Sequence, residues 1–247
     1  YYEGMRDRDN LRSICKQGRR GLAPFKGYDK STEGSDWIIK CAKKKSDRPL
    51  WILVWGGLED LAQALHDAPE IKKRIKVYWI GGPNKKWSVN SYLYIVKHFP
   101  DLFFIENNAS YRGFISDNTK EDKFNNGYYD NFINGAGYLG ADFKRYYEGN
   151  VKMGDTPSLL YLMNGNSDNP CGESWGGSFE RMEYSNRFVF DRNTTINDTV
   201  PTYSIIELIF SGPKIEKEAG TPCFTLHIDK QKWDGYYLGN GSYSVKY

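Results

Sequence analysis

The first half of the chain alternates short apolar runs with amphipathic segments. Apolar runs occupy residues 50–55, 76–80 and 101–105, and runs of this length predict strands that are buried on both faces. Between them, residues 58–66 and 91–98 have the spacing of amphipathic helices. Strands that alternate with helices predict an α/β domain, in which helices flank a mostly parallel sheet.

A segment before the first apolar run also has helical spacing. Ser35 is a suitable N-cap for a helix over residues 36–45. Trp37 falls on the apolar face of this helix, whereas Lys40, Lys43 and Lys44 lie outside it. We interpret the basic run as the solvated face of the helix.

The last quarter of the chain has a different pattern, in which short strand-like runs are separated by turns. These runs lie at residues 188–190, 203–210, 224–228 and 243–247. We therefore expect an α/β domain over residues 1–186 and a small β-rich domain over residues 187–247. Because the last run reaches the final residue, we also expect the second domain to be truncated.

Glycine and polar residues follow the three strands predicted in the α/β domain, where open α/β sheets bind their ligands. The candidate ligand-binding residues at these strand ends are Gly56, Gly57, Asp60, Gly82, Asn84, Glu106 and Asn107. Glycines allow the backbone to approach a ligand, and carboxylates and amides can hold sugar hydroxyls or a hard cation. The same residues also suit tight turns and the first turn of a helix, where acidic side chains are favoured. Both interpretations stay open at this point.

The composition narrows the class of ligand. Aromatic residues make up 16% of the chain, with 19 Tyr and 7 Trp, which favours sugar or nucleobase ligands, although strands are also rich in Tyr. A net charge of +3 is too small for a protein whose main partner is nucleic acid. No apolar run approaches the roughly 18 to 20 residues that span a bilayer. The four cysteines fit one disulfide or four free thiols equally well.

Several short motifs resemble the nucleoside hydrolase superfamily. Residues 48–65 resemble the superfamily's buried strand and the Gly-Pro-Leu-Thr-Asn-Leu-Ala turn that follows it. Residues 33–39, 154–160 and 174–180 are similar to a secreted branch described as cellulose-binding proteins with a nucleoside-hydrolase-like domain. The resemblance covers roughly residues 10–182, in consistent order and spacing.

The resemblance implies a calcium site, because the parent superfamily uses calcium to activate the attacking water. By position, it assigns a metal-binding backbone carbonyl to Glu59 and a metal-binding carboxylate to Asp155. The first strand and its aspartate cluster are missing, and Gly154 stands where a catalytic His is common. We therefore expect calcium in a full-length parent but not in this chain, and the catalytic residues stay unassigned.

The resemblance also implies a glycosidic ligand, either derived from a glycan or N-ribosyl, at the carboxyl edge of the sheet. Two functions remain open, namely hydrolysis of a glycosidic bond and non-catalytic binding of a cellulose-like polysaccharide. We expect Glu59, Gly82, Asn84, Glu106 and Asp155 to line one crevice. We expect Trp175, Gly176 and Gly177 to border it, since an indole beside two glycines offers a face for sugar stacking. The branch implies secretion to the periplasm or the extracellular space.

Overall fold

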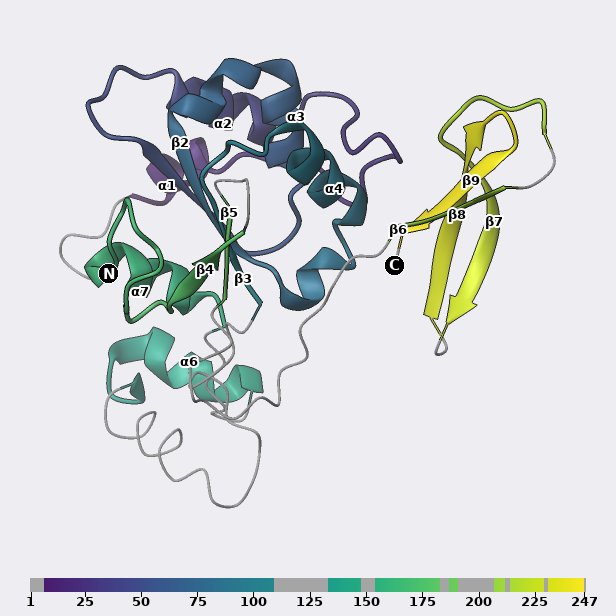
Figure 1. The fold of residues 1–247 in the computed structure, drawn as a ribbon. Helices are drawn as coiled ribbons and strands as arrows, with labels where there is room; N and C mark the ends of the chain where they lie inside the picture. Colours follow the sequence, from purple (N-terminus) through teal and green to yellow (C-terminus); the bar gives the residue numbers. More distant parts are fainter. Residues whose placement is uncertain are drawn as a thin grey trace.

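The structure is a computed structural model of the chain with two separate sheets (Figure 1). It describes residues 7–108, 133–147, 154–182, 187–190, 207–211, 214–228 and 231–246. The first sheet belongs to an α/β unit and the second consists of the C-terminal strands. The predicted fold class, a mostly parallel sheet flanked by helices and followed by a small β region, is confirmed.

The first sheet has the strand order β1-β2-β3-β5-β4. Its strands are β1 (Leu50–Val54), β2 (Ile75–Ile80), β3 (Phe104–Asn107), β4 (Phe179–Arg181) and β5 (Arg187–Phe190). The neighbours β1, β2, β3 and β5 are parallel, and β4 is antiparallel to β5. The strand at residues 188–190, expected in the C-terminal region, instead joins this sheet, where Phe188 is buried against Phe103.

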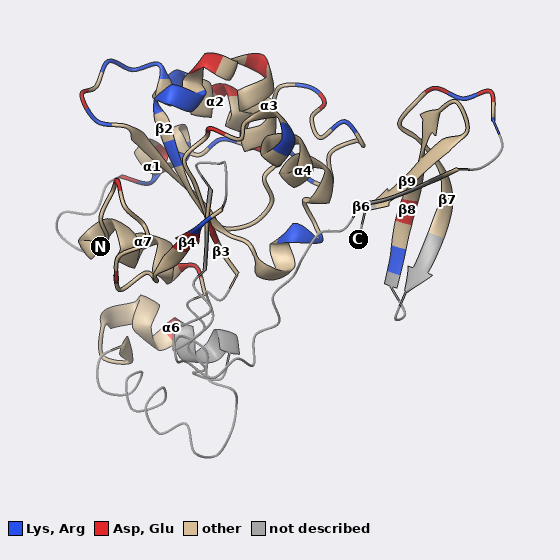
Figure 2. Ribbon diagram, viewed as in Figure 1, with Lys and Arg blue, Asp and Glu red and all other residues tan. Residues whose placement is uncertain are grey.

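The helices of the α/β unit are α1 (Arg8–Ile14), α2 (Glu33–Ala42), α3 (Glu59–Asp67), α4 (Val89–His98), α6 (Gly137–Tyr147) and α7 (Thr156–Asn164), with 3-10 helices η1 (Pro69–Lys73) and η2 (Gly82–Lys85). Helix α2 begins earlier than expected, because Thr32 is its N-cap and forms a capping box with Ser35. The loop from α2 to β1 is rich in Lys and Arg (Figure 2).

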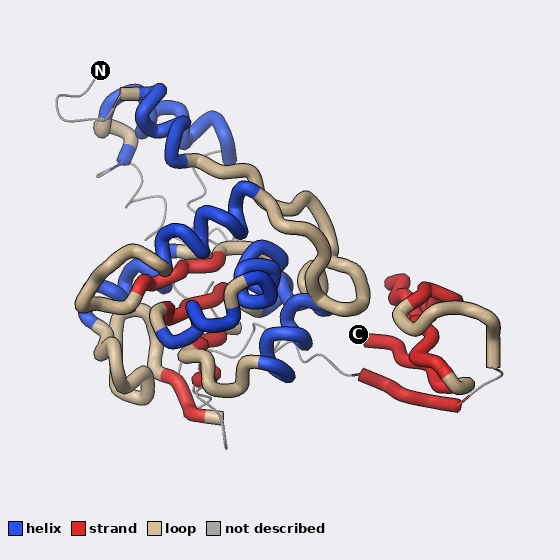
Figure 3. The backbone as a smooth tube through the Cα atoms, turned by 90° about the horizontal axis from the view of Figure 1, so that it is seen from above, coloured by secondary structure: helices blue, strands red, loops and turns tan. Residues whose placement is uncertain are grey.

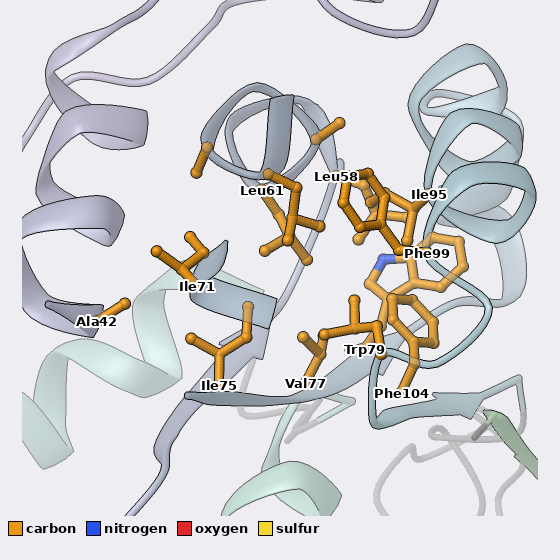
Figure 4. Close-up of a cluster of buried hydrophobic side chains, with 14 of the residues drawn as sticks. Ala42, Leu58, Leu61, Ile71, Ile75, Val77, Trp79, Ile95, Phe99 and Phe104 are labelled. Atoms are coloured by element: carbon orange, nitrogen blue, oxygen red, sulfur yellow. The ribbon is translucent and has the colours of Figure 1, made fainter. Parts of the chain in front are cut away.

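Alternate residues of β2 point into two hydrophobic clusters, as the pleat of a strand requires. Val77 and Trp79 pack with side chains of α2, α3 and α4 on one face of the sheet (Figure 4). Tyr78 and Ile80 pack on the other face with Tyr161 of α7. A strand covered on both faces has little room for polar residues, which explains why the apolar runs predicted these strands correctly.

The second sheet is antiparallel, with the strand order β6-β9-β8-β7. Its strands are β6 (Glu207–Ser211), β7 (Thr221–Ile228), β8 (Gln231–Gly239) and β9 (Ser242–Lys246). It lies to one side of the α/β unit when the molecule is viewed from above (Figure 3). The rings of Phe25 and Tyr236 join the two parts, with centroids 4.7 Å apart.

Two further features of the sequence have clear outcomes. All four cysteines are free thiols, so no disulfide joins the two sheets. In the part of the chain that the structure describes, no helix has the length and apolar character needed to cross a membrane.

Candidate functional site

The strand-end residues meet at one edge of the first sheet, because β1, β2 and β3 run parallel. The indole Nε1–H of Trp79 donates to the carbonyl of Gly56 across 2.8 Å. The N–H of Gly82, a residue with φ of 47°, donates to Asn108 Oδ1 across 2.9 Å. Asn84 turns its amide back to the carbonyl of Ile80, 2.8 Å away. The expected convergence of strand ends is therefore present, and most of its polar atoms are already paired.

Glu59 is the first residue of α3, and its side chain is buried at 8% exposure. Ser88 donates its hydroxyl to Glu59 Oε1 across 3.0 Å and accepts the N–H of Leu58 across 2.7 Å. Burial raises the pKa of the Glu59 carboxyl, while hydrogen bonds from Ser88 and the backbone act in the opposite direction. Gly57 lies close to this carboxylate, and a Cβ there would lie 2.0 Å from Glu59 Oε2, so a larger residue would displace the carboxylate.

Asp60 turns its carboxylate toward the segment that precedes α2. The backbone N–H of Arg19 donates to Asp60 Oδ1 across 3.1 Å, and the hydroxyl of Thr32 donates to the same oxygen across 2.6 Å. A Cβ on Gly18 would lie 1.8 Å from Asp60 Oδ2, so this contact is tight. Asp60 therefore holds the N-terminal segment on α3, and a role in ligand binding stays a prediction.

Glu106 forms a buried ion pair at the end of β3. Its side chain is 1% exposed, and Lys85, which pairs with it, is 7% exposed. The hydroxyl of Tyr92 donates to Glu106 Oε2 across 2.8 Å, and the Asn108 amide donates to Oε1 across 3.0 Å. The negative charge of Glu106 is thus neutralised within the protein. The neighbouring Asn107 is also buried and donates its amide to the Tyr78 hydroxyl across 2.8 Å.

Asp155 lies near the end of β1, to which Ser158 connects it, and its place in a crevice with Glu59, Gly82, Asn84 and Glu106 stays a prediction. It immediately precedes α7, and Ser158 Oγ donates to its carbonyl across 2.7 Å. Ser158 also accepts the indole Nε1–H of Trp55, which follows β1, across 2.8 Å. Burial raises the pKa of the Asp155 carboxyl.

Trp175, Gly176 and Gly177 are held against α7 and the middle of β2. The N–H of Trp175 donates to Asn164 Oδ1 across 2.9 Å, at the last residue of α7. The carbonyl of Gly176 accepts the hydroxyl of Tyr78 across 2.6 Å. The indole of Trp175 is 63% exposed. These contacts place the backbone of the segment beside the sheet, and its role at the strand-end crevice stays a prediction.

The described residues do not fit the calcium ion that the resemblance implies. Calcium takes about six to eight oxygen ligands, and no group of three or more His, Cys, Asp and Glu side chains among the described residues could hold a metal. The carbonyl of Glu59 lies in the first turn of α3, where helical hydrogen bonding uses it. The carboxylates of Asp60 and Glu106 are bonded to donors of the protein itself.

Two exposed indoles at this edge are absent from the sequence-based site. Trp55 follows β1 and is 57% exposed, and Trp87 follows η2 and is 63% exposed. Trp55 is the last residue of an apolar run that predicts a buried strand, so the sequence predicted that it would be buried. Trp87 lies seven residues beyond β2, so the sequence did not indicate that it lies near the strand end. A search for aromatic residues at the end of each predicted strand and in the loop that follows it would have found both.

Comparisons with known proteins agree with this architecture. Residues 2–179 match the family described as cellulose-binding Sde182, nucleoside hydrolase-like domain. A solved structure from Saccharophagus degradans, described as a nucleoside hydrolase-related hypothetical protein associated with carbohydrate metabolism, matches with a TM-score of 0.54 and 17% identity. The match covers 100% of this chain and 75% of that chain, and at this identity it shows the fold alone. No curated protein matches the chain.

Proposed function

This chain belongs to the cellulose-binding Sde182, nucleoside-hydrolase-like domain family, and from that premise we propose that it binds carbohydrate without cleaving it. The ligand is a cellulose-like polysaccharide, and the site is the carboxyl edge of the first sheet. One observation carries the proposal. Trp55 and Trp87 at this edge stay more than half exposed, while the carboxylates of Glu59, Asp60 and Glu106 are bonded within the protein.

The exposed indoles supply what a sugar needs for binding. The C–H face of a pyranose ring packs on an aromatic ring, because both surfaces are apolar. The bond from Trp55 Nε1 to Ser158 fixes the indole while 57% of the residue remains exposed. A ring that is ordered before binding loses less side-chain entropy when the ligand arrives.

The carboxylates at this edge argue for binding rather than catalysis. A glycosidase of the usual kind needs two carboxyl groups that flank the bond to be cleaved. Glu59 and Glu106 are buried, and Asp60 is bonded to Arg19 and Thr32. We therefore propose that this chain retains no calcium and hydrolyses no N-glycosidic bond. Metal analysis of the purified chain tests this proposal, and stoichiometric calcium would contradict it.

The location follows from the ligand. Cellulose-like polysaccharides lie outside the cytoplasm, so we propose that the protein is secreted to the periplasm or the extracellular space. Fractionation of cells that express the full-length gene, followed by immunodetection, checks this proposal.

The decisive experiment measures binding to microcrystalline cellulose and, by calorimetry, to cello-oligosaccharides. We expect Trp55→Ala and Trp87→Ala each to weaken binding at least tenfold, which corresponds to about 1.4 kcal/mol. Trp87→Phe keeps an aromatic face and should retain most of the affinity. Ile14→Ala is the control, because Ile14 is an exposed apolar residue on α1, at 46% exposure. Unchanged binding by both Trp→Ala variants would refute the proposed site.

Hydrolysis of a glycosidic bond is the second candidate, and the raised pKa of the Asp155 carboxyl favours it. A carboxyl that keeps its proton to higher pH can protonate the oxygen of a leaving group. The test is release of reducing sugar or free base from a panel of glycosides and nucleosides. Turnover by the wild type that Asp155→Asn abolishes, with ligand binding retained, would replace the binding function with this one.

A further inference from the structure

Three lysine side chains surround one indole on helix α2. The indole belongs to Trp37 of α2. The Nζ atoms of Lys16, Lys40 and Lys44 lie 5.2, 5.0 and 5.9 Å from the centroid of its ring. We call Lys16, Trp37, Lys40 and Lys44 the α2 basic surface.

The α2 basic surface is a product of the tertiary structure as well as of the helix. Lys40 follows Trp37 by three positions within α2, so the helix places both on one side, and Lys44 lies in the turn just beyond the end of the helix. Lys16 comes from the segment between α1 and α2. That segment is fastened by the bond from the N–H of Gln17 to Glu33 and by the contacts of Asp60. Folding therefore adds a third positive charge to a pair that already repel each other.

The charges of this surface are not neutralised by the described part of the chain. Lys43, on the neighbouring side of the helix end, pairs with Glu70 across 2.8 Å. Within the ranges that the structure describes, Lys16, Lys40 and Lys44 form no such ion pair, and all three are exposed. Exposed like charges repel one another, so this cluster does not stabilise the fold.

The surroundings add more positive charge. The guanidinium of Arg74 donates to the carbonyl of Lys44 across 2.6 Å, just beyond the end of α2. Lys and Arg continue along the loop from α2 to β1 (Figure 2). An anion that approaches this face meets several ammonium groups within about one Debye length, which is about 8 Å at physiological ionic strength.

We propose that the α2 basic surface binds an acidic polysaccharide, and specifically a polymer of uronic acids. The carboxylates of such a polymer pair with the ammonium groups, and its sugar rings pack on the part of the Trp37 indole that remains exposed. This surface shares no residue with the strand-end indoles, so the protein joins a neutral and an acidic polysaccharide. A nucleic acid is disfavoured as the occupant, because the net charge of the chain is only +3.

The test compares binding of the intact chain to polygalacturonate and to cello-oligosaccharides by affinity electrophoresis and calorimetry. We expect the double variant Lys40→Gln/Lys44→Gln to bind polygalacturonate at least tenfold more weakly and cello-oligosaccharides as the wild type does. Trp55→Ala should show the reverse pattern. Failure of the cellulose site and failure of this one are therefore distinguishable.

The matched control is Lys73→Gln/Lys97→Gln, which removes the same charge from exposed positions on η1 and α4. It should bind polygalacturonate within twofold of the wild type. Circular dichroism and thermal melting check that each variant is folded. An equal loss in the control would show attraction by overall charge and overturn the proposal. So would an absence of polygalacturonate binding in the wild type, or tighter binding of single-stranded RNA than of polygalacturonate.

Discussion

The charged groups at the strand ends and those on α2 have opposite environments. At the strand ends, Glu106 is buried and paired with Lys85, and Asp60 accepts hydrogen bonds from Arg19 and Thr32. On α2, Lys16, Lys40 and Lys44 are exposed and gather around one indole. The charged groups at the strand ends are bonded within the folded protein, whereas those around Trp37 remain available to a binding partner. The difference teaches that a polar cluster at the expected binding edge is not by itself a binding site.

The buried ion pair offers the strongest test of this comparison. Lys85→Met leaves the Glu106 carboxylate buried without its cation, and breaking a buried pair in this way costs about 3–5 kcal/mol. Urea denaturation measures the free energy of unfolding. Lys85→Met/Glu106→Leu removes both charges and should recover most of the loss. A cost below about 1 kcal/mol for the single variant would show that the pair is accessible to water.

Asp60 provides the next largest effect. Asp60→Ala leaves the N–H of Arg19 and the hydroxyl of Thr32 without their acceptor, which should reduce stability by about 1–3 kcal/mol. The segment that precedes α2 should also become more susceptible to limited proteolysis. If Asp60 instead serves the ligand alone, the variant will lose affinity for cello-oligosaccharide with no change in unfolding or proteolysis.

Glu59 gives a prediction that depends on pH. Burial raises the pKa of its carboxyl in the folded state above the ordinary value of 4.5. The folded protein therefore holds this proton more tightly than the unfolded chain, and this contribution to stability is lost as pH rises through the raised pKa. Glu59→Gln cannot ionise, so its stability relative to the wild type should improve between pH 4 and pH 7. Denaturation curves at the two pH values check the sign, and a constant difference would contradict it.

The α2 basic surface should show the smallest effect on stability, with the opposite sign. Lys40→Gln relieves the repulsion among the exposed ammonium groups around Trp37 and should stabilise the protein by about 0.2–1 kcal/mol. Thermal melting at low ionic strength measures this gain, which should shrink in high salt because salt screens exposed charges. A loss of stability would mean that the cation–π contact with Trp37 outweighs the repulsion.

Much of the fold could be predicted from the sequence because its core follows simple periodic patterns. The strands β1 and β2 and the helices α3 and α4 were expected close to their observed positions. The assignment of residues 188–190 was wrong, because a run of three apolar residues can pair with any free sheet edge. In the structure the free edge is that of β3, and Phe188 packs against Phe103.

The candidate site was less predictable than the fold. The sequence predicted that Glu59, Asp60 and Glu106 lie at one edge of the sheet. The family resemblance predicted the same edge for Asp155. The sequence did not reveal their partners, because Ser88 lies 29 positions from Glu59 and Lys85 lies 21 positions from Glu106. It also gave no sign that Trp55 and Trp87 stay exposed, since exposure depends on what packs beside a residue.

By itself, the sequence determined the strands β1 and β2, the helices α3 and α4, and that the strand ends share an edge, because these follow from local periodicity and parallel pairing. Only the tertiary structure decided which charges are neutralised. Distant segments must pack together before a carboxylate can bond its donor. Glu106 pairs with Lys85 in this way, and Asp60 accepts the N–H of Arg19. The same packing places Lys16 beside Trp37 and leaves that surface positive. Which charges pair depends on the three-dimensional packing of the chain. The spacing of residues in the sequence predicts such pairs only within one helix or between paired strands.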